Sequence, residues 1–352
     1  MTDKSRFLSG VIEGFYGQCW SWKSREDYAV FLADCGMNSY IYAPKSEPYL
    51  RKRWRECWPD NEFQQLKQLS SVYRQAGLNF GVGLSPFELY RNFDQQAKAQ
   101  LTAKLNQIES LAPKVLCILF DDMRGDLPSL AKHQVEICDF VASNISVDRL
   151  IMCPTYYSFD PVLEKVFGAM PANYWQELGE GLSSVWDVFW TGDKVVSKNY
   201  STDSLAAIAS QLGRKPLLWD NYPVNDGEKI SNFLHLAEVE RKTELKSSTQ
   251  GLLCNPMNQA ELSKAALYAT SMQLRGRKIN QADLFHELFG EELSAMLIQD
   301  LNSFEKVGLL ELSIADKQRL KDKYKTLNHL GAKEVYDWLD GKYKFDTACL
   351  TD

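Results

Sequence analysis

Two adjacent carboxylates, Asp121 and Asp122, are the residues of this sequence whose types and spacing most directly suggest chemistry. They follow an unbroken apolar run at residues 115–120, which is typical of a β-strand buried on both faces. Because an ionised Asp inside such a strand would carry a large desolvation cost, we expect the pair at the rim of the sheet. Barrel and open-sheet enzymes place their reactive groups there, at the carboxyl end of a parallel strand.

Neighbouring acids suit a reaction on one side of a bond. Glycosidases that use two direct carboxylates hold them about 5–9.5 Å apart, on opposite faces of the sugar, which adjacent residues do not match. In a substrate-assisted reaction, one ionised Asp would instead pull on the N–H of a 2-acetamido group, whose carbonyl oxygen attacks the anomeric carbon. The other Asp, kept protonated, would protonate the leaving oxygen. Two structural alternatives stay open at this point: a helix N-terminal cap, or a divalent-metal site that includes Asp126.

Eight short apolar runs, each followed by a stretch with helical spacing, must position these residues. This alternation predicts a parallel sheet, and eight units over residues 7–273 match a (β/α)₈ TIM barrel of about 250 residues. An open doubly wound sheet is the rival, but Glu13–Gly17 is not the glycine-rich loop that such sheets usually carry. The predicted strands are Phe7–Ile12, Met37–Ala43, Asn79–Leu84, Val115–Phe120, Leu150–Cys153, Val185–Trp190, Lys215–Trp219 and Gly251–Cys254, and the helical stretches lie near 24–35, 60–76, 95–111, 128–144, 161–178, 201–212, 228–240 and 258–273.

The carboxyl ends of these strands carry aromatic, amide and charged residues. Aromatic rings cover the apolar faces of a pyranose, and Asp and Asn bond its hydroxyls, so a sugar pocket is indicated. All four histidines fall in helical stretches, which argues against a His-based triad or a His-ligated zinc. The strand-end residues are Glu13 to Tyr16, Lys45, Ser85, Asp121, Asp122, Thr155 to Tyr157, Trp190, Thr191, Trp219 to Asn221, Asp226 and Asn255.

Composition narrows the class of protein. The chain has 352 residues and a net charge of −6, so no basic field for nucleic acid or another polyanion exists, and the run Arg51–Arg53 is interpreted as a solvated helix face. Eight cysteines without a CxxC pair suit a reducing compartment. No signal peptide and no apolar stretch of about 18 residues is found, so we expect a cytoplasmic protein that does not enter a membrane.

The residues beyond the predicted barrel have helical spacing from Asn280 to about Tyr343, with Asn280 and Ser313 as candidate caps. We therefore expect two domains, a catalytic barrel at residues 1–275 and a small helical appendage at residues 276–352. The appendage is interpreted as packing on the flank of the barrel and not as a separate functional module.

Eight stretches, in order along the predicted barrel, resemble glycoside hydrolase family 84, the β-N-acetylglucosaminidases that include O-GlcNAcase and the bacterial hyaluronidase-type enzymes. The resemblance implies a (β/α)₈ fold and hydrolysis with retention through an oxazoline intermediate, without a metal or other cofactor. The matching stretches are Gly10–Gly17, Tyr40–Lys45, Trp54–Glu56, Leu119–Asp122, Cys153–Thr155, Trp190–Gly192 with Lys194–Lys198, Trp219–Asn221 with Asn225–Asp226, and Asn255–Asn258.

The resemblance also implies roles for single residues. Asp121 would orient and polarise the acetamido group, and Asp122 would act as general acid and then as general base. Tyr157 and Trp219 would wall the acetamido pocket, with Asn221 at its polar end. The sugar hydroxyls would be bound by Lys45, Asp226, Asn255 and the backbone at Gly14.

The resulting hypothesis is a retaining, exo-acting β-N-acetylglucosaminidase that acts on terminal β-linked GlcNAc of a glycan or glycoprotein, with O-GlcNAc on protein among the candidates. The sequence does not identify the aglycone or the oligomeric state. A non-catalytic barrel that binds N-acetyl sugars, and a metal-dependent hydrolase built on Asp121, Asp122 and Asp126, are the alternatives. Hydrolysis of an aryl N-acetylglucosaminide excludes the first, and activity that survives a chelator excludes the second.

Overall fold

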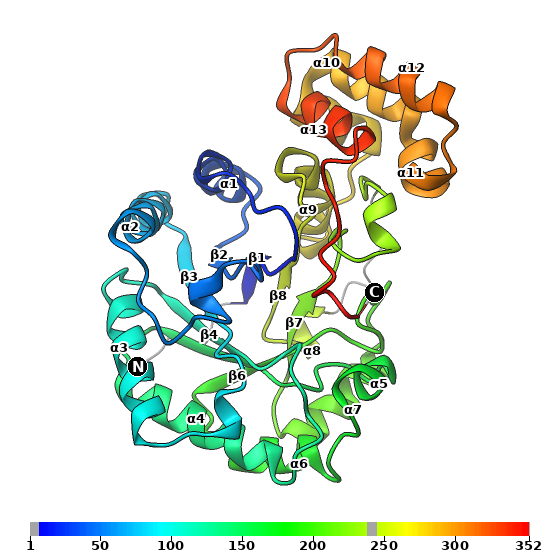
Figure 1. Ribbon diagram of the computed structural model, residues 1–352. Coiled ribbons are helices and arrows are strands. Elements are labelled where there is room, and N and C mark those ends of the chain that lie inside the picture. Colours follow the sequence, from blue (N-terminus) through cyan, green and yellow to red (C-terminus); the bar gives the residue numbers. More distant parts are fainter. Residues whose placement is uncertain (1–6, 238–244, 352) are drawn as a thin grey trace.

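A closed barrel of eight parallel strands forms the centre of the computed structural model, which describes residues 7–237 and 245–351 (Figure 1). Each strand pairs with the next along the chain, and β1 closes the ring against β8, with Leu8 opposite Gly251. The predicted (β/α)₈ fold is therefore confirmed. The strands are β1 (Leu8–Glu13), β2 (Ser39–Tyr42), β3 (Asn79–Leu84), β4 (Val115–Leu119), β5 (Arg149–Cys153), β6 (Trp186–Trp190), β7 (Leu217–Asp220) and β8 (Gly251–Cys254).

Helices surround the strands, and within the described residues seven of the nine barrel helices begin where a side chain caps the first turn or where Asp or Glu lies in it. Ser21, Asp94 and Ser201 each accept a hydrogen bond from the backbone three residues on, at the starts of α1, α3 and α7. The barrel helices are α1 (Trp22–Asp34), α2 (Asp60–Gln75), α3 (Gln95–Glu109), α4 (Leu130–Asn144), α5 (Val162–Phe167), α6 (Tyr174–Gly181), α7 (Thr202–Leu212), α8 (Leu245–Ser248) and α9 (Ala260–Leu274), with 3₁₀ turns at Pro48–Leu50, Leu89–Arg91 and Ile230–Asn232.

Two predicted helices differ from the structure. The stretch 161–178 is broken into α5 and α6, because Gly168 has a φ of 93° and Pro171 follows. The stretch 228–240 contains only the turn Ile230–Asn232 within the described residues, and residues 238–240 lie outside them. In that turn Ser231 and Asn232 bond their side chains to the carbonyl of Glu228, which competes with helix formation.

A second group of helices lies at one side of the barrel and shares an apolar cluster with a face of α9 (Figure 1). The predicted caps are present, since Asn280 accepts from the backbone of Ala282 and Ser313 from that of Asp316. The division into domains at residues 1–275 and 276–352 stays a prediction. The elements are α10 (Gln281–Asn302), a π-helical turn (Ser303–Val307), α11 (Gly308–Glu311), α12 (Ile314–Tyr324) and α13 (Leu330–Leu339).

After α13 the chain turns back, and residues 341–351, drawn in red, cross from these helices to the mouth of the barrel (Figure 1). Within the described residues, no helix has both the length and the apolar character needed to cross a membrane. The carboxyl ends of the eight strands face this mouth, where the polar residues predicted from the sequence gather.

Candidate active site

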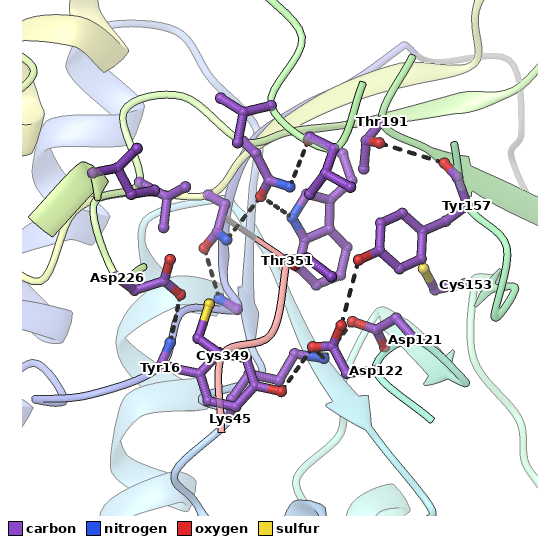
Figure 2. Close-up of a pocket in the computed structure, with 18 residues that line it drawn as sticks. Tyr16, Lys45, Asp121, Asp122, Cys153, Tyr157, Thr191, Asp226, Cys349 and Thr351 are labelled. Atoms are coloured by element: carbon purple, nitrogen blue, oxygen red, sulfur yellow. Dashed lines mark hydrogen bonds and ion pairs between the residues drawn. The ribbon is translucent and has the colours of Figure 1, made fainter. Parts of the chain in front are cut away.

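One pocket at the barrel mouth collects all nine residues predicted to bind or react with a sugar (Figure 2). They come from the ends of β1, β2, β4, β5, β7 and β8 and from the loops that follow these strands. Because parallel strands in a closed barrel end at the same rim, residues more than 200 positions apart become neighbours. These nine are Gly14, Lys45, Asp121, Asp122, Tyr157, Trp219, Asn221, Asp226 and Asn255.

Asp121 is buried, lines the pocket and forms an ion pair with the ammonium of Lys45. Burial raises the pKa of the Asp121 carboxyl, and the Lys45 ammonium opposes this rise. Only one carboxylate oxygen is engaged in this way. The other, Oδ1, is buried and has no hydrogen-bond partner among the described residues, so it can accept an N–H from a bound molecule.

Asp122 is held from several sides. Its backbone has a φ of 55°, a left-handed conformation that turns its carboxylate toward the pocket beside that of Asp121 (Figure 2). The hydroxyl of Tyr16 donates to Asp122 Oδ2 at 2.7 Å, and that of Tyr157 donates to Oδ1 at 3.4 Å. Lys45 Nζ lies 3.9 Å from Oδ2, so one ammonium faces both acids.

A network of side chains forms the opposite wall. Trp219 Nε1 donates to Asn221 Oδ1 at 2.9 Å, and Asn255 Nδ2 donates to the same oxygen at 3.0 Å. Asn255 Oδ1 in turn accepts from the backbone N–H of Gly14 at 3.1 Å. A Cβ atom at position 14 would lie 2.3 Å from the Trp219 ring, so only glycine lets the indole reach this position.

Asp226 reaches the pocket from the loop after β7. Its Oδ2 accepts from the backbone N–H of Tyr16 at 2.8 Å. Burial is the largest influence on the carboxyl and raises its pKa to about 6. The loop after β1 is also tied to the loop after β8, since Asn258 Nδ2 donates to the carbonyl of Tyr16 at 2.8 Å.

Some predicted strand-end residues point elsewhere. Glu13 is buried outside the pocket, where Arg25 binds both of its carboxylate oxygens and Tyr40 donates to it. Successive residues of a strand face opposite sides, so Glu13 faces away from the pocket and Gly14, the next residue, faces it. Ser85, Thr155 and Trp190 are likewise buried next to the pocket without lining it.

Asp126, the third acid of the alternative metal site, pairs with Arg124 near the surface and does not line the pocket. Within residues 7–237 and 245–351, no cluster of three or more His, Cys, Asp or Glu side chains has the arrangement of a metal site. In the pocket, the carboxylates of Asp121 and Asp122 are bonded instead to the Lys45 ammonium and to two tyrosine hydroxyls. These partners do not belong to the oxygen ligand set of a divalent metal.

The burial of Arg51 and the contact between Tyr16 and Asp122 are among the features of the site that were not predicted. We expected a solvated Arg51, but the structure buries it. Its Nη2 donates to the backbone carbonyl of Asp122 at 3.0 Å, and the guanidinium lies close to the rings of Tyr16 and Phe87. Composition gave no signal for this, because only the return of residues 48–51 to the barrel mouth buries the side chain. Tyr16 was among the strand-end residues, but its contact with Asp122 depends on the closed barrel.

The arrangement combines an acceptor, Asp121, with a hydrogen-bonded acid, Asp122, on one side of a pocket whose other side is aromatic and amide-bearing. It can hold an amide N–H at Asp121 while a proton moves at Asp122. The two acids share a side, so a direct displacement between opposed carboxylates does not fit.

Comparisons with known proteins agree with this geometry. The family model described as beta-N-acetylglucosaminidase matches residues 9–296. The chain is 30% identical to the protein O-GlcNAcases of Rattus norvegicus and Mus musculus over 272 residues, which are 75% of this chain but only 29% of each relative. Among solved structures, a mutant of the Thermobaculum terrenum O-GlcNAc hydrolase superposes with a TM-score of 0.78 at 29% identity, over 96% of this chain and 81% of that one.

Proposed function

Since the chain belongs to the β-N-acetylglucosaminidase family, glycoside hydrolase family 84, we propose that it hydrolyses terminal β-linked N-acetylglucosamine with retention of configuration. One observation carries the proposal: Asp121 and Asp122 face the same pocket side by side, and Asp121 Oδ1 is a buried acceptor with no partner among the residues described. A 2-acetamido group presents the N–H that this oxygen accepts.

In the first step, Asp121 accepts the acetamido N–H, so electron density moves onto the carbonyl oxygen, which attacks the anomeric carbon. Asp122 gives its proton to the glycosidic oxygen, the bond to the aglycone breaks, and an oxazolinium forms that becomes a neutral oxazoline as its N–H proton passes to Asp121. In the second step that proton returns to the oxazoline nitrogen, and Asp122 removes a proton from a water that attacks the same carbon. The bond from this carbon to the oxazoline oxygen breaks, which restores the acetamido group. The sugar leaves with its original configuration.

The other lining residues act on the ground-state sugar. Tyr157 and Trp219 would enclose the acetamido methyl, with Asn221 orienting its polar end. Lys45, Asp226 and Asn255 would bond the hydroxyls, together with the backbone at Gly14. The Lys45 ammonium also favours the ionised form of Asp121, because it lies against that carboxylate in a buried site.

The substrate class we propose is a GlcNAc-bearing glycan or glycoprotein, and the O-GlcNAcase relatives make a glycosylated Ser or Thr the first aglycone to test. Release of N-acetylglucosamine should be compared for an O-GlcNAc peptide, chitobiose and a muropeptide at equal concentration. We also propose a cytoplasmic location, which the buried thiols of Cys117, Cys138 and Cys153, none of them in a disulfide, support.

Substitution of the two acids tests the mechanism. Asp122→Asn should lower kcat/KM by about 10²–10⁴-fold for substrates with poor leaving groups and by much less for activated aryl glycosides, because only the former need the proton. Asp121→Asn should impair both classes, because the acetamido oxygen that Asp121 activates displaces every leaving group, good or poor. Thermal unfolding of each variant serves as the folding control.

Equal and slight losses for both variants would contradict this mechanism. Binding of N-acetylglucosamine by the parent protein without hydrolysis of an aryl N-acetylglucosaminide would instead support the alternative, a non-catalytic sugar-binding barrel.

A further inference from the structure

The segment that follows α13, residues 341–351, enters the pocket just described. We call it the return segment. It leaves the helices α10–α13, passes the loop after β1 near Gly17 and ends among the carboxyl ends of the strands (Figures 1 and 2). A short turn directs it inward, since the backbone N–H of Cys349 donates to the Asp346 carbonyl at 2.9 Å and Asp346 Oδ1 accepts from the backbone of Ala348.

Two side chains of the return segment line the pocket. Cys349 lies near Tyr16, Lys45 and Asp226, whereas Thr351 lies near Tyr157 and the two acids (Figure 2). Burial raises the pKa of Tyr157, and a side-chain hydrogen bond with Thr351 opposes that rise. Leu350, between them, is 54% exposed, so side chains alternate between pocket and solvent as in an extended strand.

The space left in the pocket is small. Its cavity volume is about 50 Å³ with the return segment in place. Pockets that hold small molecules usually measure about 300–1,000 Å³. A space of this size accommodates water and not a pyranose with an acetamido arm, so some of the surrounding chain must move before a sugar enters.

We propose that the return segment determines substrate access to the pocket: residues 345–351 occupy it in competition with the sugar and must leave before catalysis. The eight strands form a closed ring in which each strand is hydrogen-bonded to its neighbours. In the pocket wall, Trp219, Asn221 and Asn255 are joined by hydrogen bonds between their side chains. The described part of the return segment places two side chains, Cys349 and Thr351, in the pocket and lies outside the ring of strands, so we expect it to move at less cost than the barrel.

This inference rests on the proposed function for its substrate, and it predicts a particular kinetic signature. A segment that competes with substrate lowers the fraction of protein able to bind it, which raises the apparent KM and leaves kcat unchanged. Leaving groups with more contacts outside the pocket would displace the segment more readily, so it would also discriminate between aglycones.

A matched pair of full-length variants tests it. Thr351→Glu puts a carboxylate beside Asp121 and Asp122, and repulsion between like charges should unseat the segment. Leu350→Glu adds the same charge one residue away on the exposed side and should leave the segment in place. With an aryl N-acetylglucosaminide, we expect Thr351→Glu to lower KM at least about threefold at unchanged kcat, and Leu350→Glu to match the parent protein.

Two further measurements separate this proposal from the function it rests on. Calorimetry should show tighter binding of N-acetylglucosamine to Thr351→Glu than to the parent, whether or not either protein hydrolyses the aryl glycoside. Amide hydrogen exchange of residues 345–351 in the parent should accelerate when the sugar binds. A higher KM or a lower kcat in Thr351→Glu, or slower exchange with sugar bound, would mean that the segment builds the site and would overturn the proposal.

Equal KM and equal sugar affinity in all three proteins, with hydrolysis intact, would remove the return segment from substrate access and leave the proposed function standing. If all three proteins fail to hydrolyse the glycoside while Thr351→Glu still strengthens sugar binding, the proposed function is contradicted and the role of the return segment in access stands. Failure of every protein to bind the sugar would contradict both.

Discussion

At the scale of single residues, Tyr16 and Arg51 hold Asp122 and orient its carboxyl group in the pocket. The Tyr16 hydroxyl donates to Oδ2 at 2.7 Å, while Arg51 binds the backbone carbonyl of the same residue, which lies in a left-handed conformation. Both contacts are partly buried, and there one hydrogen bond is worth more than at the surface. These positioning contacts come from the loops after β1 and β2, so the acid on β4 is oriented by its neighbours around the ring.

Tyr16→Phe should therefore lower kcat without unfolding the protein. Loss of a hydrogen bond to a carboxylate costs about 1.5–3 kcal/mol, which corresponds to roughly a 10–100-fold fall in kcat if the bond is kept in the transition state. Steady-state kinetics on a substrate with a poor leaving group measures this. As a control, Tyr156→Phe removes a hydroxyl that donates to the Gly168 carbonyl outside the pocket. A change in KM alone for Tyr16→Phe would speak for a binding role.

At the scale of elements, the buried pair between Glu13 and Arg25 joins the end of β1 to helix α1. Arg25 donates to both carboxylate oxygens of Glu13 at 2.6 and 2.9 Å, and the two side chains are 0–5% exposed. This pair positions the loop that carries Gly14 and Tyr16. A strand-end acid can thus serve packing between a strand and a helix instead of chemistry.

Glu13→Gln should destabilise the fold by about 3 kcal/mol or more, because it leaves the buried Arg25 guanidinium without its counter-charge. Urea unfolding measures the free energy of unfolding. Asp27→Asn breaks the exposed pair with Lys23 on the same helix and should cost less than about 0.5 kcal/mol. A Glu13 variant as stable as the parent but inactive would place Glu13 in the reaction.

At the scale of the whole molecule, the helices beyond the barrel are attached to it through α9. Glu334 on α13 accepts the backbone N–H groups of Glu261 and Leu262 at 3.0 and 2.9 Å, in the first turn of α9. Burial raises the pKa of the Glu334 carboxyl from its ordinary 4.5 to about 8. The same helical group is where the return segment starts, so the attachment bears on access to the pocket.

This contact predicts a pH dependence of stability. A carboxyl with a raised pKa in the folded state binds a proton more tightly there than in the unfolded chain, so its stabilisation is present below about pH 4.5 and is lost as the pH rises through about 8. The parent protein should lose stability relative to Glu334→Gln over that window, as measured by urea unfolding at a series of pH values. A gain in stability with rising pH would show instead that Glu334 is ionised and stabilises α9 as a charged cap.

The sequence by itself determined the barrel and nine of the residues that line the pocket. Eight apolar runs with intervening helical spacing predict parallel strands, and a closed parallel ring brings all carboxyl ends to one rim, so Lys45, Asp121, Asp226 and Asn255 were expected together and lie together. This inference needs only local periodicity and the handedness of the connections. It predicts which residues meet, and it leaves open which way each side chain points.

The tertiary structure alone decided which way each side chain points and which distant segments of the chain return to the barrel mouth. Glu13 and Gly14 are neighbours in sequence, yet one faces α1 and the other the pocket, and Arg51 is buried although it begins a basic run. The return of Cys349 and Thr351 to the barrel mouth has no local signal at all. Such contacts arise from packing between segments far apart in the chain, where burial and paired charge outweigh the preferences of any short stretch.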